Sequence, residues 1–345
     1  MTVYRIDPLL DPRWPELLHR HSDASAFHTT GWLHSLQRSY RYEPMVFTTS
    51  PPRSELRNGL VFCEVKSWLT GSRLVSLPFS DHCQPLADDA KELQSMLERL
   101  QQVAIERRLK YIELRPLDSE HVTDGTHFSK CASYAFHKID LRSSAETIFG
   151  KFHDSCIRRK VRKAEREQLI YEVGRSDALL QKFRHLFLLT RRRHNLPPQP
   201  LSWFRNLVSC LGDRLSIHVA SKGPDPVASI ITVSYKRSLI YKYGCSDARF
   251  SNCGGTPLLF WKAIQEGKKS GAEEFDLGRS DLIDPGLSTF KEHLGGVASE
   301  LTYSRFSIEP SGKALPKLPY IRRAFARMPD SVFTGAGRLL YRHMG

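Results

Sequence analysis

Two parts of this chain carry the same order of expected strands and helices, and this repeat constrains the fold more than any other feature of the sequence. Alternating or continuous apolar runs indicate strands, and apolar residues three or four apart indicate helices. In the first part, three strands, a helix and two strands are expected at 44–49, 60–68, 73–80, 89–109, 111–117 and 134–141. In the second part, the same order is expected at 215–221, 226–236, 238–246, 257–271, 273–278 and 298–306. A duplicated mixed α/β unit is the simplest fold with this order.

The length of 345 residues suits two such units. We expect an N-terminal unit over 1–142, a C-terminal unit over 143–310 that begins with basic linker helices at 143–194, and a basic amphipathic tail over 311–345. The apolar runs are far shorter than a membrane span, and the first residues lack a basic stretch followed by an apolar run. We therefore expect a cytoplasmic protein.

Positive charge gathers in two stretches. The chain has 51 Lys and Arg against 37 Asp and Glu, a formal charge of +14. Residues 151–193 hold thirteen basic against five acidic residues, and 311–345 hold seven against one. Nearly single-signed runs such as 158–166 favour phosphate-bearing ligands, RNA or anionic lipid headgroups, with a solubilising surface as the alternative. The tail is suited to lie on an anionic membrane surface, on the inner face, but its short apolar side favours docking on the protein or disorder.

Several common active sites are missing from the sequence. It has no phosphate loop, HExxH, GxSxG elbow or GxGxxG fingerprint, which excludes most kinases, zinc and serine hydrolases and dinucleotide oxidoreductases. The seven cysteines are scattered singly without CxxC spacing, so we expect reduced thiols and no metal site.

One loop before a helix is suited to bind an anion. Residues 251–256 are small and precede the helix expected at 257–271, whose free N–H groups would face a phosphate while the glycines allow it to approach. In the first part, Asp88 and Asp89 stand at the corresponding helix start and would repel a phosphate. The residues expected to bind the ligand that carries this phosphate are Asn252, Gly254, Gly255, Thr256 and, on the preceding strand, Tyr243.

The order of three strands, a helix and a strand is similar to the GNAT acyltransferase fold. Two such units with a basic helix between them, here at 157–169, resemble the FemAB family of peptidoglycan bridge-forming transferases and its relatives with acetyltransferase-like domains. The segments that match these relatives are YKYGCSD (241–247), LLFWKAIQEGKKSGAEEFDLG (258–278) and FKEHLGG (290–296). The resemblance covers about residues 25–306 and implies an α/β (α+β mixed) fold of two GNAT-like units, each a mixed twisted sheet flanked by helices.

The resemblance also implies a reaction. Members of the group move an acyl group from acyl-coenzyme A or from aminoacyl-tRNA to an amine, so the donor is a co-substrate and no cofactor is permanently bound. Lys291 matches the lysine of a similar FK motif in the Fem enzymes, which implies a contact with the reacting carbonyl. Typical acetyl-CoA users carry an arginine closer to the glycines than Arg249 is.

Other residues are candidates on chemical grounds. Asp276 and Asp281 lie at the end of an expected strand, where one of them is suited to accept the amine proton; the alternative is that Asp276 caps a turn and Asp281 pairs with Arg279. His194 and His293 are second choices as the base. Tyr241 and Tyr243 are expected on the same face of one strand.

Acceptor binding is expected at a cluster of basic residues that would hold phosphates or a peptide carboxylate. These residues are Arg191, Arg192, Arg193, His194 and Arg279. The loop at 76–86 is expected to form part of the acceptor groove.

Three functions remain open at this point. The first is N-acyl transfer from an acyl-CoA to an amine of a cell-envelope or polysaccharide precursor. The second is aminoacyl transfer from a tRNA, in which the basic stretch at 151–193 would contact the RNA. The third is a polyanion-binding scaffold that kept the fold and lost the chemistry.

Overall fold

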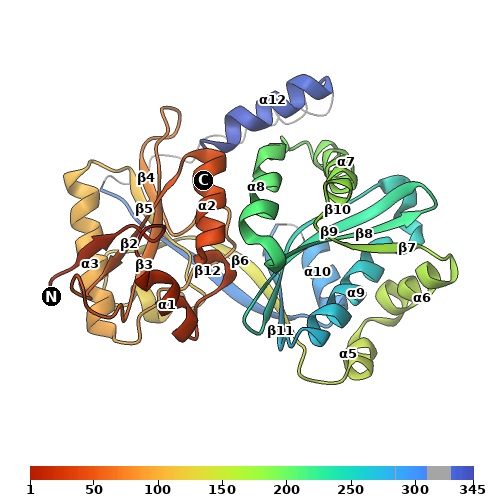
Figure 1. Ribbon diagram of the computed structural model, residues 1–345, viewed down its shortest axis with the longest axis horizontal. Coiled ribbons are helices and arrows are strands. Elements are labelled where there is room, and N and C mark those ends of the chain that lie inside the picture. The colour runs from red at the N-terminus through yellow and green to blue at the C-terminus, as the bar shows by residue number, and fades with distance from the viewer. Residues whose placement is uncertain (284, 309–327) are drawn as a thin grey trace. The chain divides into compact units, whose positions relative to one another are not determined.

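The computed structural model describes residues 1–283, 285–308 and 328–345 of the chain (Figure 1). These residues form two compact units. Of the described residues, unit 1 comprises 1–134, 300–308 and 339–345, and unit 2 comprises 135–283, 285–299 and 328–338. No helix among the described residues is long and apolar enough to cross a membrane.

The two halves of the sequence share one order of elements: a strand, two helices, three strands, a helix, a strand, a helix and a strand. The first half has β1 (Tyr4–Ile6), α1 (Arg13–Arg20), α2 (Thr30–Tyr40), β2 (Glu43–Thr48), β3 (Leu60–Val65), β4 (Arg73–Val75), α3 (Ala90–Glu106), β5 (Tyr111–Leu114), α4 (Ser119–Thr123) and β6 (Ser129–Asp140). The second half has β7 (Ile170–Gly174), α7 (Asp177–Arg193), α8 (Leu201–Leu211), β8 (Leu215–Lys222), β9 (Asp225–Tyr235), β10 (Ser238–Ser246), α9 (Gly255–Lys269), β11 (Glu274–Asp281), α10 (Pro285–His293) and β12 (Val297–Phe306). The repeat expected from the sequence is therefore confirmed. Extra elements precede each set of three strands, and α4 and α10 lie between the last two strands of each half.

The sheet of unit 1 is mixed. Strands β1 to β4 pair antiparallel in chain order, β4 pairs parallel with β5, and the end of β12 pairs antiparallel with β5. Helix α3 packs on this sheet through Met96, Leu97 and Leu100, which are buried. Asp89 caps α3 by accepting hydrogen bonds from the backbone N–H groups of Lys91 and Glu92, as the sequence indicates.

The sheet of unit 2 repeats this pattern. Strands β7 to β10 pair antiparallel in chain order and β10 pairs parallel with β11. The end of β6 lies next to β11, where the Lys138 ammonium donates to Glu274. The sequence pattern places a boundary between 142 and 143 and keeps the strand at 298–306 in the C-terminal unit. Since the ends of β6 and β12 each join the sheet of the other half, the observed units divide these strands instead.

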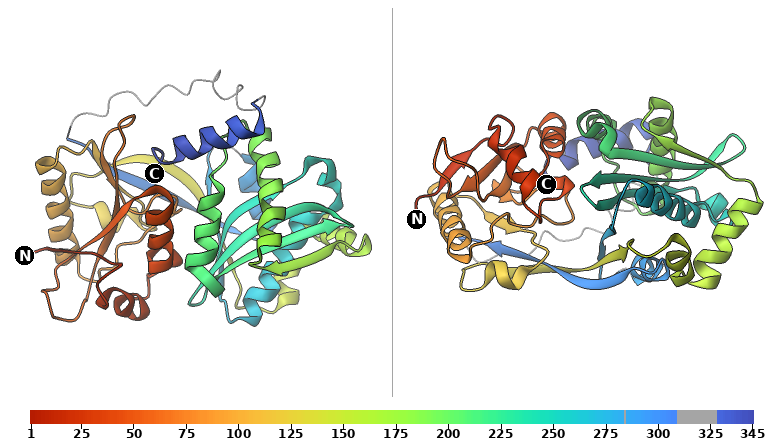
Figure 2. Two further views of the ribbon diagram at one scale, coloured as in Figure 1. Left: turned by 45° about the horizontal axis from the view of Figure 1, so that its top comes forward. Right: turned by 60° about the horizontal axis from the view of Figure 1, so that its bottom comes forward.

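Helices lie against both faces of the unit 2 sheet (Figures 1 and 2). Helix α7 packs on β8, β9 and β10, and α9 packs on β8 and β9. The core on the α9 side includes Leu259, Phe260, Ile264 and Phe275, all buried.

The basic stretch after residue 144 is interrupted, whereas the sequence suggests continuous helical spacing over 145–169. It consists of α5 (Ala145–Lys151), a π-helical turn (Asp154–Arg158) and α6 (Arg159–Arg166). Helix α5 ends at Lys151 because the backbone of Phe152, the next residue, is extended. Val161 and Ala164 of α6 are buried against α9, so the basic side chains face outward.

The C-terminal residues form helix α12 (Asp330–Tyr341), which docks within unit 2 at its first turn. The Arg192 guanidinium binds the Asp330 carboxylate and lies 4.5 Å from the ring centroid of Phe333, which is fully buried. The described part of the expected tail is therefore docked on the protein. The rest of that tail, residues 311–327, lies outside the described residues.

His218 on β8 makes unit 2 sensitive to acid. Its Nδ1 lies 2.8 Å from the Tyr171 hydroxyl and its Nε2 lies 2.9 Å from Thr232 Oγ1. Burial lowers the pKa of His218 from 6.5 to about 4. The unfolded chain therefore binds a proton that the folded chain excludes, and the stabilisation present above pH 6.5 is lost as the pH falls towards 4.

We expect the His218→Gln variant to lose less stability than the parent when the solution is acidified. Between about pH 7.5 and about pH 5, its unfolding free energy should fall by roughly 2 kcal/mol less than that of the parent in urea titrations. His127→Gln, which replaces an exposed histidine, is the control and should follow the parent. Equal acid sensitivity in the parent and in His218→Gln would contradict the prediction.

Candidate active site

Strands β10 and β11 separate after a short paired segment. The parallel pairing covers Ser238–Ile240 with Glu274–Asp276 and ends there. A bulge in β10 between Tyr241 and Tyr243 shifts its register with β9 at the same level. The carboxyl ends of the two neighbouring strands therefore diverge, and such ends are where open α/β sheets bind ligands.

Because of the bulge, Tyr241 and Tyr243 do not lie on the same face of the sheet. With Lys242 as the extra residue, Tyr241 and Tyr243 contact opposite sides of the sheet. The Tyr241 ring lies 4.8 Å from that of Phe260 on α9, whereas the Tyr243 ring packs on Phe204 of α8 at 5.2 Å. The prediction of a common face was wrong because it assumed regular alternation.

The end of β11 is shaped by Gly278 and Asp276. Gly278 has a φ of +70°, a conformation that glycine adopts without strain, and its N–H donates to Asp276 Oδ1 at 2.6 Å. Asp276 is buried, and Asp281 is exposed at the last position of the strand. Asp276 thus caps a turn, as one of its two interpretations proposed.

The buried side chain of Lys291, on α10, binds this turn. Its side chain is 1% exposed, and its ammonium donates to the carbonyl oxygens of Gly278 at 2.8 Å and Arg279 at 3.0 Å. Consecutive carbonyls of a regular strand point to opposite sides, and the left-handed Gly278 lets both face one ammonium. A buried positive charge is therefore held at the end of β11, where the strands diverge.

His137 is a candidate that the sequence pattern does not single out. It lies on β6, is fully buried, and has its Nε2 at 3.7 Å from the Glu292 carboxylate of α10. Burial, together with the ammonium of Lys291, lowers the pKa of His137, so its imidazole is neutral at pH 7. Its only sequence signal is a histidine at a buried position of an expected strand.

The N-terminus of α9 is covered by α6. Gly254 has a φ of +75°, and a Cβ at this position would lie 2.2 Å from the carbonyl oxygen of Lys160. A Cβ on Gly255 would lie 2.8 Å from Val227 Cγ2. Both glycines thus allow the chain to pack closely on itself, whereas the sequence pattern suggests that they admit a phosphate.

The other residues expected to bind the donor are dispersed. Asn252 is exposed and Thr256 half-buried. The Tyr243 hydroxyl accepts hydrogen bonds from Gln199 at 3.0 Å and from the Trp203 indole at 2.8 Å. Arg249 pairs with Asp247 at 2.6 Å, and this interaction lowers the pKa of the carboxyl group.

The residues expected to bind the acceptor also contact the protein itself. Arg191 donates to the carbonyl oxygen of Pro197 at 3.0 Å, and Arg192 holds Asp330 of α12. Arg193 and His194 are exposed at the end of α7, while Arg279 is half-buried. Arg191 and Arg192 therefore position the 195–200 loop and α12.

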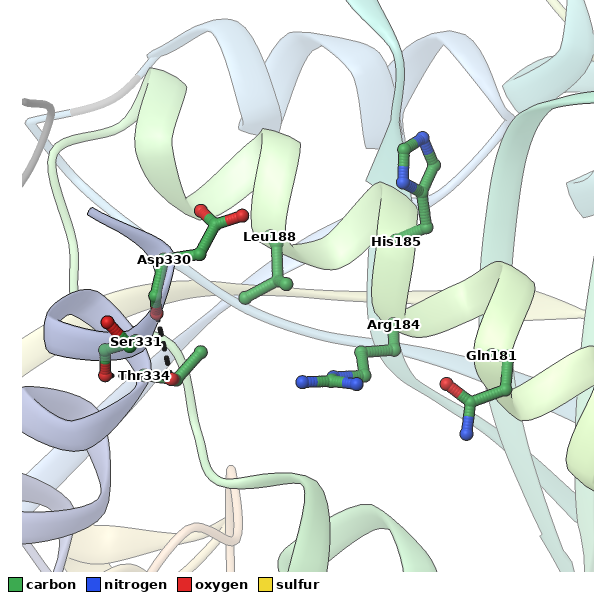
Figure 3. Close-up of a pocket in the computed structure, with 7 residues that line it drawn as sticks. All are labelled: Gln181, Arg184, His185, Leu188, Asp330, Ser331 and Thr334. Carbon is green, nitrogen blue, oxygen red and sulfur yellow. Dashed lines mark hydrogen bonds between the residues drawn. The ribbon is translucent and has the colours of Figure 1, made fainter. Parts of the chain in front are cut away.

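A cavity of about 520 Å³ lies among α7, α8 and α12 in unit 2. Gln199 and Phe204 line it, and both contact Tyr243 beside the bulge of β10. Arg184 and Arg338 provide positive charge in its wall. Arg184 also lines an adjoining cavity of about 380 Å³, in which its side chain extends from α7 towards the space beside Thr334 of α12 (Figure 3).

Comparisons with known proteins agree with this architecture. Residues 153–292 match the family model of the acetyltransferase (GNAT) domain. The crystal structure of FemX is similar, with a TM-score of 0.70 and 13% identity over 89% of this chain and 98% of FemX. L-PGS from Bacillus licheniformis gives a TM-score of 0.53 and 16% identity over 97% of each chain. A tandem GNAT protein from the clavulanic acid biosynthesis pathway gives 0.55 and 8% over 90% of this chain and 99% of that one.

A search of curated protein sequences gave no significant match. The matched domain indicates acyl-transfer chemistry of the GNAT type for residues 153–292. Residues 153–292 match the GNAT acetyltransferase domain, and the chain shares the fold of two GNAT-like units with FemX and the tandem GNAT protein.

Proposed function

We propose that this chain transfers an aminoacyl group from aminoacyl-tRNA to an amine of a cell-envelope or polysaccharide precursor. The observation that carries the proposal is the contact between Lys160 of α6 and Gly254, because it fills the approach to the N-terminus of α9 that a coenzyme A pyrophosphate would use. A tRNA donor does not need that approach. FemX and L-PGS, which share the fold, are aminoacyltransferases.

The outward face of α6 supports a polyanionic donor. Its exposed basic residues are Arg159, Lys160, Arg162 and Arg166. Asp154 partly neutralises Arg159, which lies 2.9 Å away. Lys160 and Arg166 add further exposed positive charge to the same helix. These side chains would neutralise phosphates of an RNA and release the counterions condensed on it, so the affinity for RNA would rise at low salt.

The chemistry needs no covalent enzyme intermediate. The amine attacks the ester carbonyl, a tetrahedral oxyanion forms, and the tRNA 3′ oxygen leaves as the ester bond breaks. Lys291 supplies the positive charge that stabilises the oxyanion at the end of β11. The proton of the amine passes to a nearby base, for which the neutral imidazole of His137 joins Asp276 and Asp281 as a candidate.

The cavity beside Tyr243 is the proposed acceptor site. It adjoins the bulged strand through Gln199 and Phe204, and Arg184 and Arg338 suit a phosphate or carboxylate on the acceptor. The expected roles of Arg191 and Arg192 then become indirect, because they hold the loop and the helix that border this cavity.

An acyl-CoA donor is the second candidate, favoured by the separation of β10 and β11. Unpaired edges of two diverging strands suit an extended amide-containing chain such as pantetheine, which can hydrogen-bond to backbone groups. The match to an acetyltransferase family model agrees with this candidate.

Titration with tRNA and with acetyl-CoA separates the two donors. We expect tRNA binding whose affinity falls steeply between roughly 0.1 and 0.3 M salt, and the Lys160→Gln/Arg166→Gln variant should reduce the slope of log K against log salt by about 1 to 2. Filter binding or fluorescence anisotropy measures both quantities. Lys91→Gln/Arg38→Gln, which removes two exposed charges from unit 1, is the matched control.

Binding of acetyl-CoA with no binding of tRNA would contradict the aminoacyl proposal. An equal change of slope in both double variants would show that α6 is not the RNA contact. Neither result would affect the assignment of the fold.

A further inference from the structure

Three side chains with affinity for transition metals meet in unit 2. Cys156 belongs to the π-helical turn before α6, His153 caps the start of this turn, and His293 is the last residue of α10. One ring nitrogen of each histidine and Cys156 Sγ all lie within 4.8 Å of one another. The two imidazole rings have centroids 4.3 Å apart.

The backbone fixes the two segments to each other. The N–H of His153 donates to the carbonyl oxygen of His293 at 2.8 Å, so the chain is anchored at the place where the side chains meet. His153 Nδ1 accepts from the Cys156 N–H at 3.3 Å and lies 3.4 Å from Ser155 Oγ, which is 3.8 Å from Cys156 Sγ. Nδ1 of His153 therefore lies on the side of Cys156, and a zinc ion bound there would take the lone pair that this long hydrogen bond uses.

We propose that His153, Cys156 and His293 bind a zinc ion. Imidazole nitrogen and thiolate sulfur are the preferred zinc ligands, and three protein ligands leave a fourth position for water. In a tetrahedral site the ligand atoms lie about 3.3–3.7 Å apart. Side-chain rotations that move these atoms by about 1 Å would therefore bring them to zinc-binding distance. The Cys156 thiol releases its proton to solvent as the zinc–sulfur bond forms.

The surroundings suit an ion that exchanges with solvent. His153 is exposed, while Cys156 and His293 are half-buried. The ion would join the end of α10, the helix of Lys291, to the turn that leads into α6. No sequence motif marks this site, because its third ligand is distant along the chain and no CxxC is present.

Titration of the untagged, metal-free full chain with Zn²⁺ tests the proposal. We expect one strong site per chain by calorimetry, a zinc-dependent rise in melting temperature, and at least about tenfold weaker binding in Cys156→Ser and in His293→Ala. Co²⁺ in place of Zn²⁺ should give the near-ultraviolet charge-transfer absorption of a cobalt–thiolate bond, and this absorption should disappear in Cys156→Ser.

Cys131→Ser and His127→Gln replace an exposed cysteine and an exposed histidine elsewhere, and both should bind like the parent. Circular dichroism confirms that each variant is folded. Absence of a strong site in the parent, or a cobalt–thiolate band that persists in folded Cys156→Ser, would overturn the proposal.

Discussion

Replacement of Lys291 by Met lowers the rate of acyl transfer by about 10²- to 10³-fold, the range observed when one preorganised oxyanion donor is removed. Methionine keeps most of the buried aliphatic volume and removes the charge. The carbonyl oxygens of Gly278 and Arg279 lose a donor that lies 2.8 and 3.0 Å away, so a decrease in unfolding free energy of about 1–3 kcal/mol is expected as well. Single-turnover rates with a saturating donor, measured well below the melting temperature, separate the two effects.

Lys269→Met is the matched control for this variant. Lys269 lies on α9, is exposed, and pairs with Glu266 at 3.2 Å. Its replacement should leave the rate within about twofold of the parent, as expected for a surface ion pair of little energetic weight. A folded Lys291→Met variant with the parental rate would remove the proposed role of Lys291 in the reaction.

Replacement of Gly254 by Ala destabilises the fold by about 2–4 kcal/mol. Two effects add: the φ of +75° is unfavourable for alanine, and the new methyl group would lie 2.2 Å from the Lys160 carbonyl oxygen. Helix α6 must then move away from α9 or the backbone must shift. Urea unfolding monitored by circular dichroism gives the change in free energy.

Gly271→Ala separates these two effects. Gly271 also has a positive φ, +82°, but nothing lies within 4 Å of the position that an alanine methyl group would take there. The control should therefore cost only about 1 kcal/mol. Equal losses of unfolding free energy in Gly254→Ala and Gly271→Ala would mean that α6 does not cover the N-terminus of α9. That N-terminus would then be open to the pyrophosphate of coenzyme A.

The repeat of elements was predictable because the local spacing of apolar residues indicates each strand and helix. The cap at Asp89 was predictable for the same reason, since a cap depends on residues within one turn of the helix. The exchange of strand ends between the halves was not, because the neighbours of β6 and β12 are set by long-range pairing. No local signal in these strands specifies their partners.

The candidate site was predicted in part. The sequence suggests Asp276 on chemical grounds and Lys291 through the resemblance to the Fem enzymes, and both side chains bind at the Gly278 turn. The bulge at Lys242 could not be predicted, because an extra residue in a strand leaves no mark in the apolar pattern. The sequence pattern suggests that Gly254 and Gly255 admit a ligand. In the structure they allow close packing against Lys160 of α6 and Val227 of β9, which only the tertiary fold reveals.

The central claim is that the acyl carbonyl binds beside Lys291, where β10 and β11 diverge. A crystal structure with a stable amide analogue of the aminoacylated tRNA 3′ end tests it most directly. We expect the acyl oxygen at about 3 Å from Lys291 Nζ, between the two strands. An analogue bound at another place in the chain, with its acyl oxygen far from Lys291 Nζ, would contradict the claim.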